Sequence, residues 1–199
     1  MTMIKNVIFD FGQVLVRFDP EYMCSRYAKE NDVKLLSEVV FDRLYWDRLD
    51  AGTISDDEVI SAVCARLPES LHETAKKIYF KWIYNIPEID GMREVIKLCR
   101  ERGFGVYLLS NISTYFSERR DEIPMLKLLD GCVFSAECGM VKPSREIFAH
   151  ICEKYALTPE ETLFVDDNEK NVRGAEEFGI HAYRFDGDHK KLYEYISSL

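Results

Sequence analysis

Short, almost continuously apolar runs recur along the chain, and they restrict its fold more than any other feature. Strands buried on both faces of a parallel sheet give such runs, whereas strands with one face in water alternate apolar and polar residues. Because helical patterns separate the runs, we predict an α/β domain with a doubly wound, Rossmann-like parallel sheet. The four clearest runs and a weaker fifth cover residues 4–9, 105–109, 132–134, 162–165 and 181–185.

Residues that typically begin or end helices bound the segments between these runs. Asp90 is predicted to cap a helix that Gly103 ends, and Pro143 is predicted to lie in the first turn of the next one. Gly179 is predicted to end a helix whose apolar side contains Val172.

One long stretch of the chain, residues 17–86, lacks any strand pattern and carries several helical ones. Ser55 and Glu58 have the spacing of a capping box, which marks a helix start. Further helices are predicted over residues 20–27, 33–41 and 74–84. We therefore predict an all-helical cap at residues 17–86, inserted into an α/β core formed by residues 1–16 and 87–199.

The charge balance and the cysteine pattern exclude several classes of function. The chain has 26 Lys and Arg against 35 Asp and Glu, a net charge of −9, which argues against nucleic-acid and anionic-membrane partners. Its six cysteines form no CxxC pair, so a zinc site is not expected. With no signal peptide and no apolar run of 18 residues, a soluble cytoplasmic protein is expected, as a monomer or a dimer.

Polar side chains stand at or soon after the ends of the predicted strands. Asp10 follows the first run, Ser110 and Asn111 follow the second, and Lys142 lies shortly after the third. The pair Asp166-Asp167 ends the fourth. Each alone could cap a turn or lie in a solvated loop, but ligands bind where the carboxyl ends of parallel strands meet. Together these groups predict a site for a divalent metal and a phosphate.

Each of these groups has a role in such a site. Asp10 is predicted to be the nucleophile that attacks phosphorus, which divides one difficult hydrolysis into two easier steps. Mg2+ prefers oxygen ligands and would offset the repulsion between Asp10 and a phosphate, aided by Asp166 and Asp167. Lys142, Ser110 and Asn111 would hold the phosphate oxygens. Asn171 is interpreted as support for the metal ligands and Arg173 as a surface residue.

Four segments, in this order, make the chain resemble the haloacid dehalogenase (HAD) superfamily. The resemblance spans essentially the whole chain and implies a Rossmann-like core with a small helical cap of the C1 type. The segments are VIFDFGQVL at residues 7–15, LLSN at 108–111, GMVKP at 139–143 and FVDDN at 164–168.

Within the superfamily, the chain is most similar to bacterial sugar-phosphate phosphatases of the α-D-glucose-1-phosphate phosphatase type. The segment GTIS at residues 52–55 contributes to this likeness. The resemblance implies that Asp10, Asp167 and the carbonyl of Gly12 hold Mg2+, with Asp166 acting directly or through water. It also places Ser110, Asn111 and Lys142 on the phosphate of a small phosphate ester such as a sugar phosphate.

The sequence departs from the superfamily pattern two residues after Asp10. Most phosphatases of the superfamily carry there an Asp that protonates the leaving group, and this chain has Gly12. Three readings stay open. The enzyme uses an easier leaving group or a proton from the cap or water; it is a 2-haloacid dehalogenase; or it binds a phosphorylated ligand with little or no turnover. The Asp166-Asp167 pair argues against the dehalogenase, because it would repel a carboxylate substrate.

Substrate selection is expected to lie with the cap. The segment 45–48, YWDR, could present an aromatic floor and a guanidinium to a sugar, or its Tyr45 and Trp46 could belong to the core of the cap while Asp47 and Arg48 are solvated. The aromatic residues between 79 and 84 are interpreted as cap core.

Overall fold

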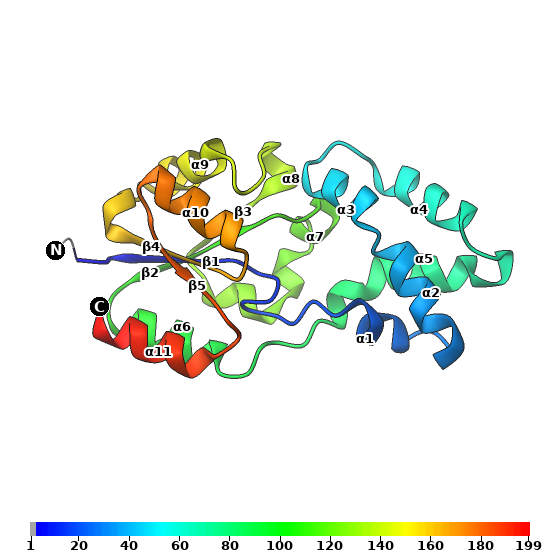
Figure 1. Ribbon diagram of the computed structural model, residues 1–199, viewed down its shortest axis with the longest axis horizontal. Helices are drawn as coiled ribbons and strands as arrows, with labels where there is room; N and C mark the ends of the chain where they lie inside the picture. The colour runs from blue at the N-terminus through cyan, green and yellow to red at the C-terminus, as the bar shows by residue number, and fades with distance from the viewer. Residues whose placement is uncertain (1–2) are drawn as a thin grey trace.

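The computed structural model describes residues 3–199 and contains a single five-stranded parallel sheet (Figure 1). The strand order is β3-β2-β1-β4-β5, so the chain first builds the sheet on one side of β1 and then on the other. This confirms the predicted doubly wound parallel sheet, and each strand lies within two residues of its predicted bounds. The strands are β1 (Asn6–Phe9), β2 (Gly105–Ser110), β3 (Gly131–Phe134), β4 (Thr162–Asp166) and β5 (His181–Arg184).

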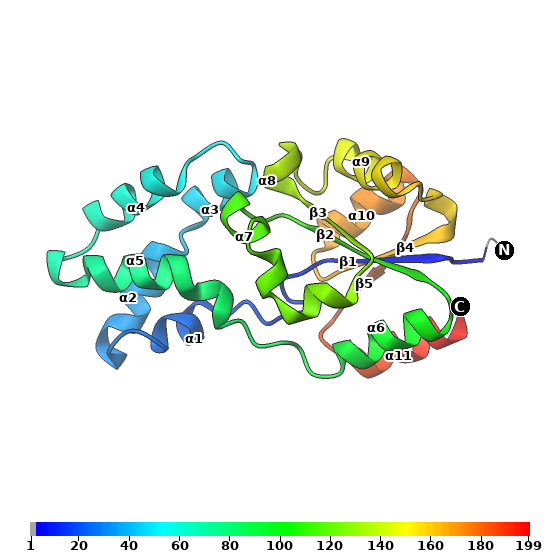
Figure 2. The same cartoon turned by 180° about the vertical axis from the view of Figure 1, so that it is seen from behind.

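Helices cover both faces of this sheet, as Figures 1 and 2 show. On one face lie α6 (Met92–Glu101) and α11 (His189–Ser198), and on the other lie α9 (Arg145–Tyr155) and α10 (Glu169–Phe178). Successive residues of a strand point to opposite faces. Val7 and Phe9 therefore belong to the apolar cluster of α6 and α11, while Ile8 belongs to that of α9 and α10. This double burial explains the continuous apolar runs.

Between β1 and α6 the chain forms helices, and Figure 1 shows them to one side of the sheet. Ser55 caps α4 with the reciprocal bonds to Glu58 that define a capping box, as predicted. The segment 43–50, for which no helix was predicted, is also helical. The helices are α1 (Pro20–Ser25), α2 (Glu30–Val40), α3 (Arg43–Asp50), α4 (Asp56–Ala65) and α5 (His72–Lys81), followed by a 3₁₀ turn at Trp82–Tyr84.

Two connections join this helical part to the sheet, and they run side by side. Val16 and Glu88 form an isolated antiparallel bridge, and the Arg17 amide donates to the Pro87 carbonyl at 2.8 Å. We call helices α1 to α5 with their loops the cap. The division of the chain at residues 17 and 86 stays a prediction.

Two predicted helix starts were wrong. Helix α6 begins at Met92 after Gly91, whose φ of 81° is left-handed, so Asp90 does not cap it. A turn there suits glycine because a Cβ at residue 91 would clash with the ring of His189. Helix α9 begins at Arg145, because Ser144 has extended backbone and serves as its N-cap; Pro143 precedes the helix. The predicted end of α10 at Gly179 is confirmed.

Among residues 3–199, no helix combines the length and the apolar character that crossing a bilayer requires.

Candidate active site

The predicted site lies where the winding direction of the sheet changes. Strand β1 pairs with β2 on one side and with β4 on the other, and β4 comes much later in the chain. Ligands of open α/β sheets bind at such a point, outside the carboxyl ends of the strands. Asp10 lies at this end of β1, and its amide still donates to the Val165 carbonyl of β4 at 2.9 Å. The sheet thus fixes the backbone of the predicted nucleophile.

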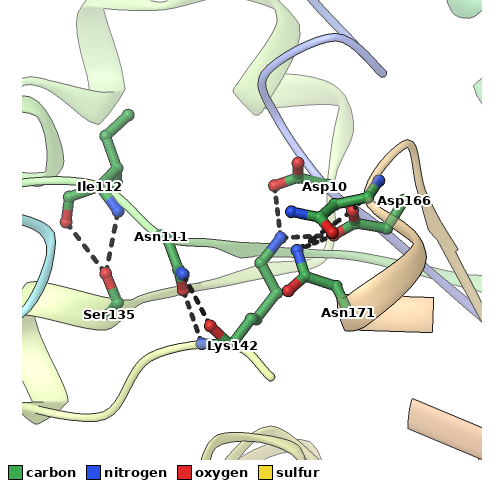
Figure 3. Close-up of polar contacts among 8 residues, drawn as sticks. Asp10, Asn111, Ile112, Ser135, Lys142, Asp166 and Asn171 are labelled. Atoms are coloured by element: carbon green, nitrogen blue, oxygen red, sulfur yellow. Dashed lines mark hydrogen bonds and ion pairs between the residues drawn. The ribbon is translucent and has the colours of Figure 1, made fainter. Parts of the chain in front are cut away.

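Lys142 lies at the centre of the site and joins two carboxylates (Figure 3). Its Nζ is 2.6 Å from Oδ1 of Asp10 and 2.7 Å from Oδ2 of Asp166, and its side chain is 1% exposed. Burial alone would lower the pKa of Lys142, but the two carboxylates outweigh burial and raise it. The ammonium therefore stays charged in the interior and fixes both acids.

The surroundings of Asp10 shift its pKa strongly. Its pKa is raised to about 7, because burial and the charge of Asp166 outweigh the lowering effect of Lys142. A carboxylate that is poorly solvated and directed by a single ammonium retains its nucleophilic character better than one in bulk water. Asp10 is the only one of the three ion-pair partners whose side chain is measurably open to solvent, at 13%.

Asp166 is held by several donors. Its Oδ1 accepts from the Asn168 amide at 2.8 Å, and the Asn171 side-chain amide donates to its two oxygens at 3.2 and 3.0 Å. Asn171 therefore holds Asp166 in place, while its predicted support of a metal site stays a prediction. Arg173, two residues on, has a side chain 69% exposed and pairs with Glu169 of the same helix.

The side chain of Asn111 forms hydrogen bonds with the backbone of Lys142. Its side-chain oxygen accepts from the Lys142 amide at 2.8 Å and its side-chain nitrogen donates to the Lys142 carbonyl at 3.1 Å (Figure 3). It thereby fixes the loop that carries Lys142, while its predicted contact with a phosphate stays a prediction. Ser110, buried at the end of β2, and Asn111 both line the cavity described below.

Three carboxylates at this edge are arranged to hold a cation. Asp10, Asp166 and Asp167 each offer an oxygen, and these atoms lie within 4.8 Å of one another. Burial, and then the charge of Asp166, raises the pKa of Asp167. Hard oxygen donors of this kind suit Mg2+, and a cation would remove the repulsion between the acids. The donor set fits such an ion.

A cavity of about 590 Å³ opens above these residues, between the sheet edge and the cap. Cavities of this size accommodate small metabolites. We call its two sides the core wall and the cap wall. The core wall contains Asp10, Gly12, Ser110, Asn111, Lys142, Asp167 and Asn171, and the cap wall contains Phe18, Phe41, Arg43, Trp46, Asp47, Asp50 and Trp82.

Gly12, which replaces the usual acid, lines the cavity without being sterically required there. A Cβ at residue 12 would meet only the Cβ of Phe18, at 4.0 Å. The missing side chain is therefore not a consequence of crowding.

The segment 45–48 agrees in part with each of its two interpretations, as a contact surface for a sugar and as the core of the cap. Trp46 is buried, donates from Nε1 to the Val40 carbonyl at 2.8 Å and also lines the cavity, as Asp47 does. Tyr45 and Arg48 do not line it. Trp82, interpreted as cap core, is both buried and part of the cap wall.

Two polar residues of the cap wall were not predicted. Arg43 and Asp50 stand at the two ends of α3, the helix for which no pattern was identified. The one available signal for Asp50 was its position two residues before Gly52, in the cap segment that carries the superfamily resemblance.

A comparison with models of protein families identifies the family of this chain. The model described as haloacid dehalogenase-like hydrolase matches residues 4–179, most of the chain. The chain belongs to this family. It is therefore a hydrolase, and the resemblance drawn from its four segments is confirmed.

Several characterised proteins are similar to this hydrolase. D-ribitol-5-phosphate phosphatase of Bacteroides thetaiotaomicron is 28% identical over 196 residues, which cover 92% of each chain. A HAD family enzyme of the same organism, solved with magnesium and inorganic phosphate, superposes with a TM-score of 0.72 at 24% identity, covering 95% of this chain and 98% of the other. L-2-haloacid dehalogenase from Xanthobacter autotrophicus gives 0.66 at 20% identity, covering 92% and 77%. The two structural likenesses confirm the fold.

Proposed function

We propose that this hydrolase is a magnesium-dependent phosphatase of small phosphomonoesters, with sugar phosphates as its preferred class, and that it acts through an aspartyl-phosphate on Asp10. The observation that carries the proposal is the Asp10–Lys142–Asp166 arrangement, in which one buried ammonium directs two carboxylates, with Asp167 beside them. A site with three acids and one lysine matches the needs of phosphoryl transfer, where positioning and charge neutralisation dominate.

In the first half of the proposed reaction, an oxygen of Asp10 attacks phosphorus and the ester oxygen departs with its electron pair. Lys142 holds Asp10 in position and offers positive charge to a non-bridging phosphate oxygen. Ser110, at the end of β2, would supply a further donor to that group, while Asn111 holds the loop that carries Lys142 in place. In the second half, water attacks the aspartyl-phosphate, and the bond between phosphorus and Asp10 breaks.

The residues that would hold the cation are Asp10 and Asp167 through their carboxylates and Gly12 through its carbonyl. When bound, Mg2+ supplies positive charge that neutralises the phosphate and permits the approach of an anionic nucleophile. Asp166, which also binds Lys142, Asn168 and Asn171, would contact the cation directly or through water. The similar HAD family enzyme was solved with magnesium and inorganic phosphate, which supports Mg2+ as the cation.

The preference for sugar phosphates rests on the cap wall and on the relative that acts on a phosphorylated polyol. Aromatic rings beside charged groups suit a carbohydrate, whose C–H faces are apolar and whose hydroxyls need polar partners. Phe18, Trp46 and Trp82 supply the rings. Phe18 contacts both tryptophans edge to face, with ring centroids 5.6 Å from Trp46 and 5.7 Å from Trp82.

The test is phosphate release from a panel of sugar, polyol and nucleotide phosphates, with Mg2+ and with EDTA. Release that requires Mg2+ and disappears in Asp10→Asn is the expected result. Binding of phosphorylated ligands by the wild-type protein without release would instead favour a binding protein. Metal-independent halide release from a 2-haloacid would favour a dehalogenase.

A further inference from the structure

The proposed reaction leaves one proton without a donor. An alkoxide is a poor leaving group unless an acid protonates its oxygen as the bond to phosphorus breaks. Gly12, at the position where most phosphatases of the superfamily carry that acid, has no side chain. The donor must therefore be another residue of the cavity or water.

Most acidic groups that line the cavity are committed elsewhere. Asp10 is the proposed nucleophile, and Asp167 belongs to the proposed cation site. Asp47 pairs with Arg43 at 2.9 Å. Of the carboxyl groups that line the cavity within residues 3–199, this leaves Asp50, whose side chain has no hydrogen bond or ion pair in that range.

Asp50 is tied firmly to the core although it belongs to the cap. Its carbonyl accepts from the Ser135 hydroxyl at 2.5 Å, and the same hydroxyl accepts from the Ile112 amide at 2.9 Å. Ile112 follows Asn111, which holds the backbone of Lys142 (Figure 3). A short chain of contacts thus connects Asp50 to the phosphate side of the site.

The turn at Gly52, which follows Asp50, packs closely against the core. A Cβ at Gly52, whose φ is 67°, would lie 2.9 Å from the Ala136 carbonyl oxygen. Only a glycine permits so close an approach in this conformation. The position of Asp50 is therefore defined on both sides, by Ser135 and by the turn that follows.

The surroundings of Asp50 favour its protonated form. Burial raises its pKa to about 7. This value includes the effects of charged neighbours: Arg43 and Lys142 lower the pKa, while Asp47 on the same helix and Asp10 across the cavity raise it. An acid with a pKa near neutrality can both give and take a proton at working pH.

We propose that Asp50, reaching the cavity from the cap, is the acid and base that serves the reaction in place of a residue at position 12. The inference rests on the proposed phosphatase activity. The Asp50 proton moves to the ester oxygen as the bond between that oxygen and phosphorus breaks and the bond to Asp10 forms, which releases the alcohol. The Asp50 carboxylate then takes a proton from the water that attacks phosphorus; the bond to Asp10 breaks, inorganic phosphate leaves, and Asp50 is protonated again.

The test compares two leaving groups in Asp50→Asn. One substrate is the sugar phosphate that the wild-type enzyme turns over fastest in the panel, and the other is p-nitrophenyl phosphate, whose leaving group departs without protonation. Because kcat/KM reports the steps up to release of the first product, we expect a loss of about 100-fold or more for the sugar phosphate. For p-nitrophenyl phosphate we expect little loss in kcat/KM, together with a burst of nitrophenolate because the second step slows.

Three further variants complete the experiment. Asp57→Asn, on the exposed side of the cap, removes the same charge and should leave both rates unchanged. Asp50→Glu keeps the acid and should retain more activity than Asp50→Asn. Gly12→Asp, for which the site has room, should restore sugar-phosphate hydrolysis when added to Asp50→Asn.

Equal losses for the two substrates in Asp50→Asn would overturn the inference, because they would show a role in binding or structure. No loss for either substrate would also overturn it. Failure of the proposed function has a different signature, since the wild-type protein would then release no phosphate or Asp10→Asn would stay active.

Discussion

The two walls of the cavity are built in different ways. On the core wall, charged side chains are buried and tied to one another, as in the pairs of Lys142 with Asp10 and Asp166. On the cap wall, aromatic rings contact one another edge to face, and Arg43 and Asp47 form an ion pair that is largely exposed. A network of fixed charges suits a reaction common to a whole family, whereas an apolar wall with a few polar groups suits selection of one substrate. The difference indicates that chemistry and selectivity can be altered separately.

The most severe test of the core wall removes the nucleophile. Asp10→Asn keeps the size of the side chain but loses the attacking carboxylate, and we expect phosphate release to fall at least about 10⁴-fold. The measurement is kcat for the best substrate of the panel with Mg2+. Thermal melting checks that the variant is folded. Substantial remaining activity would show that the chemistry does not depend on Asp10.

The next test removes the ammonium at the centre of the core wall. Lys142→Ala leaves Asp10 and Asp166 buried without their partner, and we expect it to lower the free energy of unfolding by about 3–5 kcal/mol. The measurement is urea unfolding in EDTA. The matched control is Lys5→Ala, whose lysine is 2.7 Å from Glu161 but 55% exposed, and it should cost less than about 1 kcal/mol.

Equal effects of the Lys142 and Lys5 substitutions would contradict the expectation that a buried lysine contributes more to stability than an exposed one. The comparison is direct because the two lysines form ion pairs of nearly the same length.

On the cap wall, Asp50 should make stability depend on pH in a defined direction. Its folded pKa of about 7 lies above the ordinary 3.8, so between these values the folded state binds more protons than the unfolded state. The free energy of unfolding then falls as pH rises through that window, by at most about 4 kcal/mol. Asp50→Asn removes this contribution, so the variant should gain stability over the wild type at pH 8 and little at pH 4.

Urea unfolding of both proteins in EDTA at several pH values measures the effect of Asp50. Asp10 also has a raised pKa and titrates in the same direction in both proteins, so the difference between the variant and the wild type reports Asp50 together with its interaction with Asp10. An identical pH dependence of the two proteins would show that Asp50 is well solvated.

The smallest predicted effect concerns the aromatic part of the cap wall. Aromatic contacts contribute about 0.5–1.5 kcal/mol each, so Phe18→Leu should raise KM for the best sugar phosphate by about 2- to 10-fold. Inhibition by inorganic phosphate should stay unchanged, because the core wall holds the phosphate. If phosphate inhibition weakened in parallel with KM, the two walls would not act separately.

The sequence alone predicted the sheet and the residues at its carboxyl edge. Continuous apolar runs are a local consequence of burial on both faces, and a residue that follows such a run lies at the edge of the sheet wherever the helices pack. Asp10, Ser110 and Asp166 were predictable for this reason. Helix starts at Asp90 and Pro143 were predicted wrongly, because the flanking turns depend on contacts such as the one between residue 91 and His189.

Only the tertiary structure decided which residues of the cap face the reaction. The helix of residues 43–50 was not apparent in the sequence, and its rotation is set by packing against segments far away in the chain, including the hydrogen bond from Ser135 to Asp50. The same holds for the insertion of Lys142 between Asp10 and Asp166, because these three residues come from segments far apart in the chain. The order of residues along a strand fixes the core wall, whereas long-range contacts orient the cap wall.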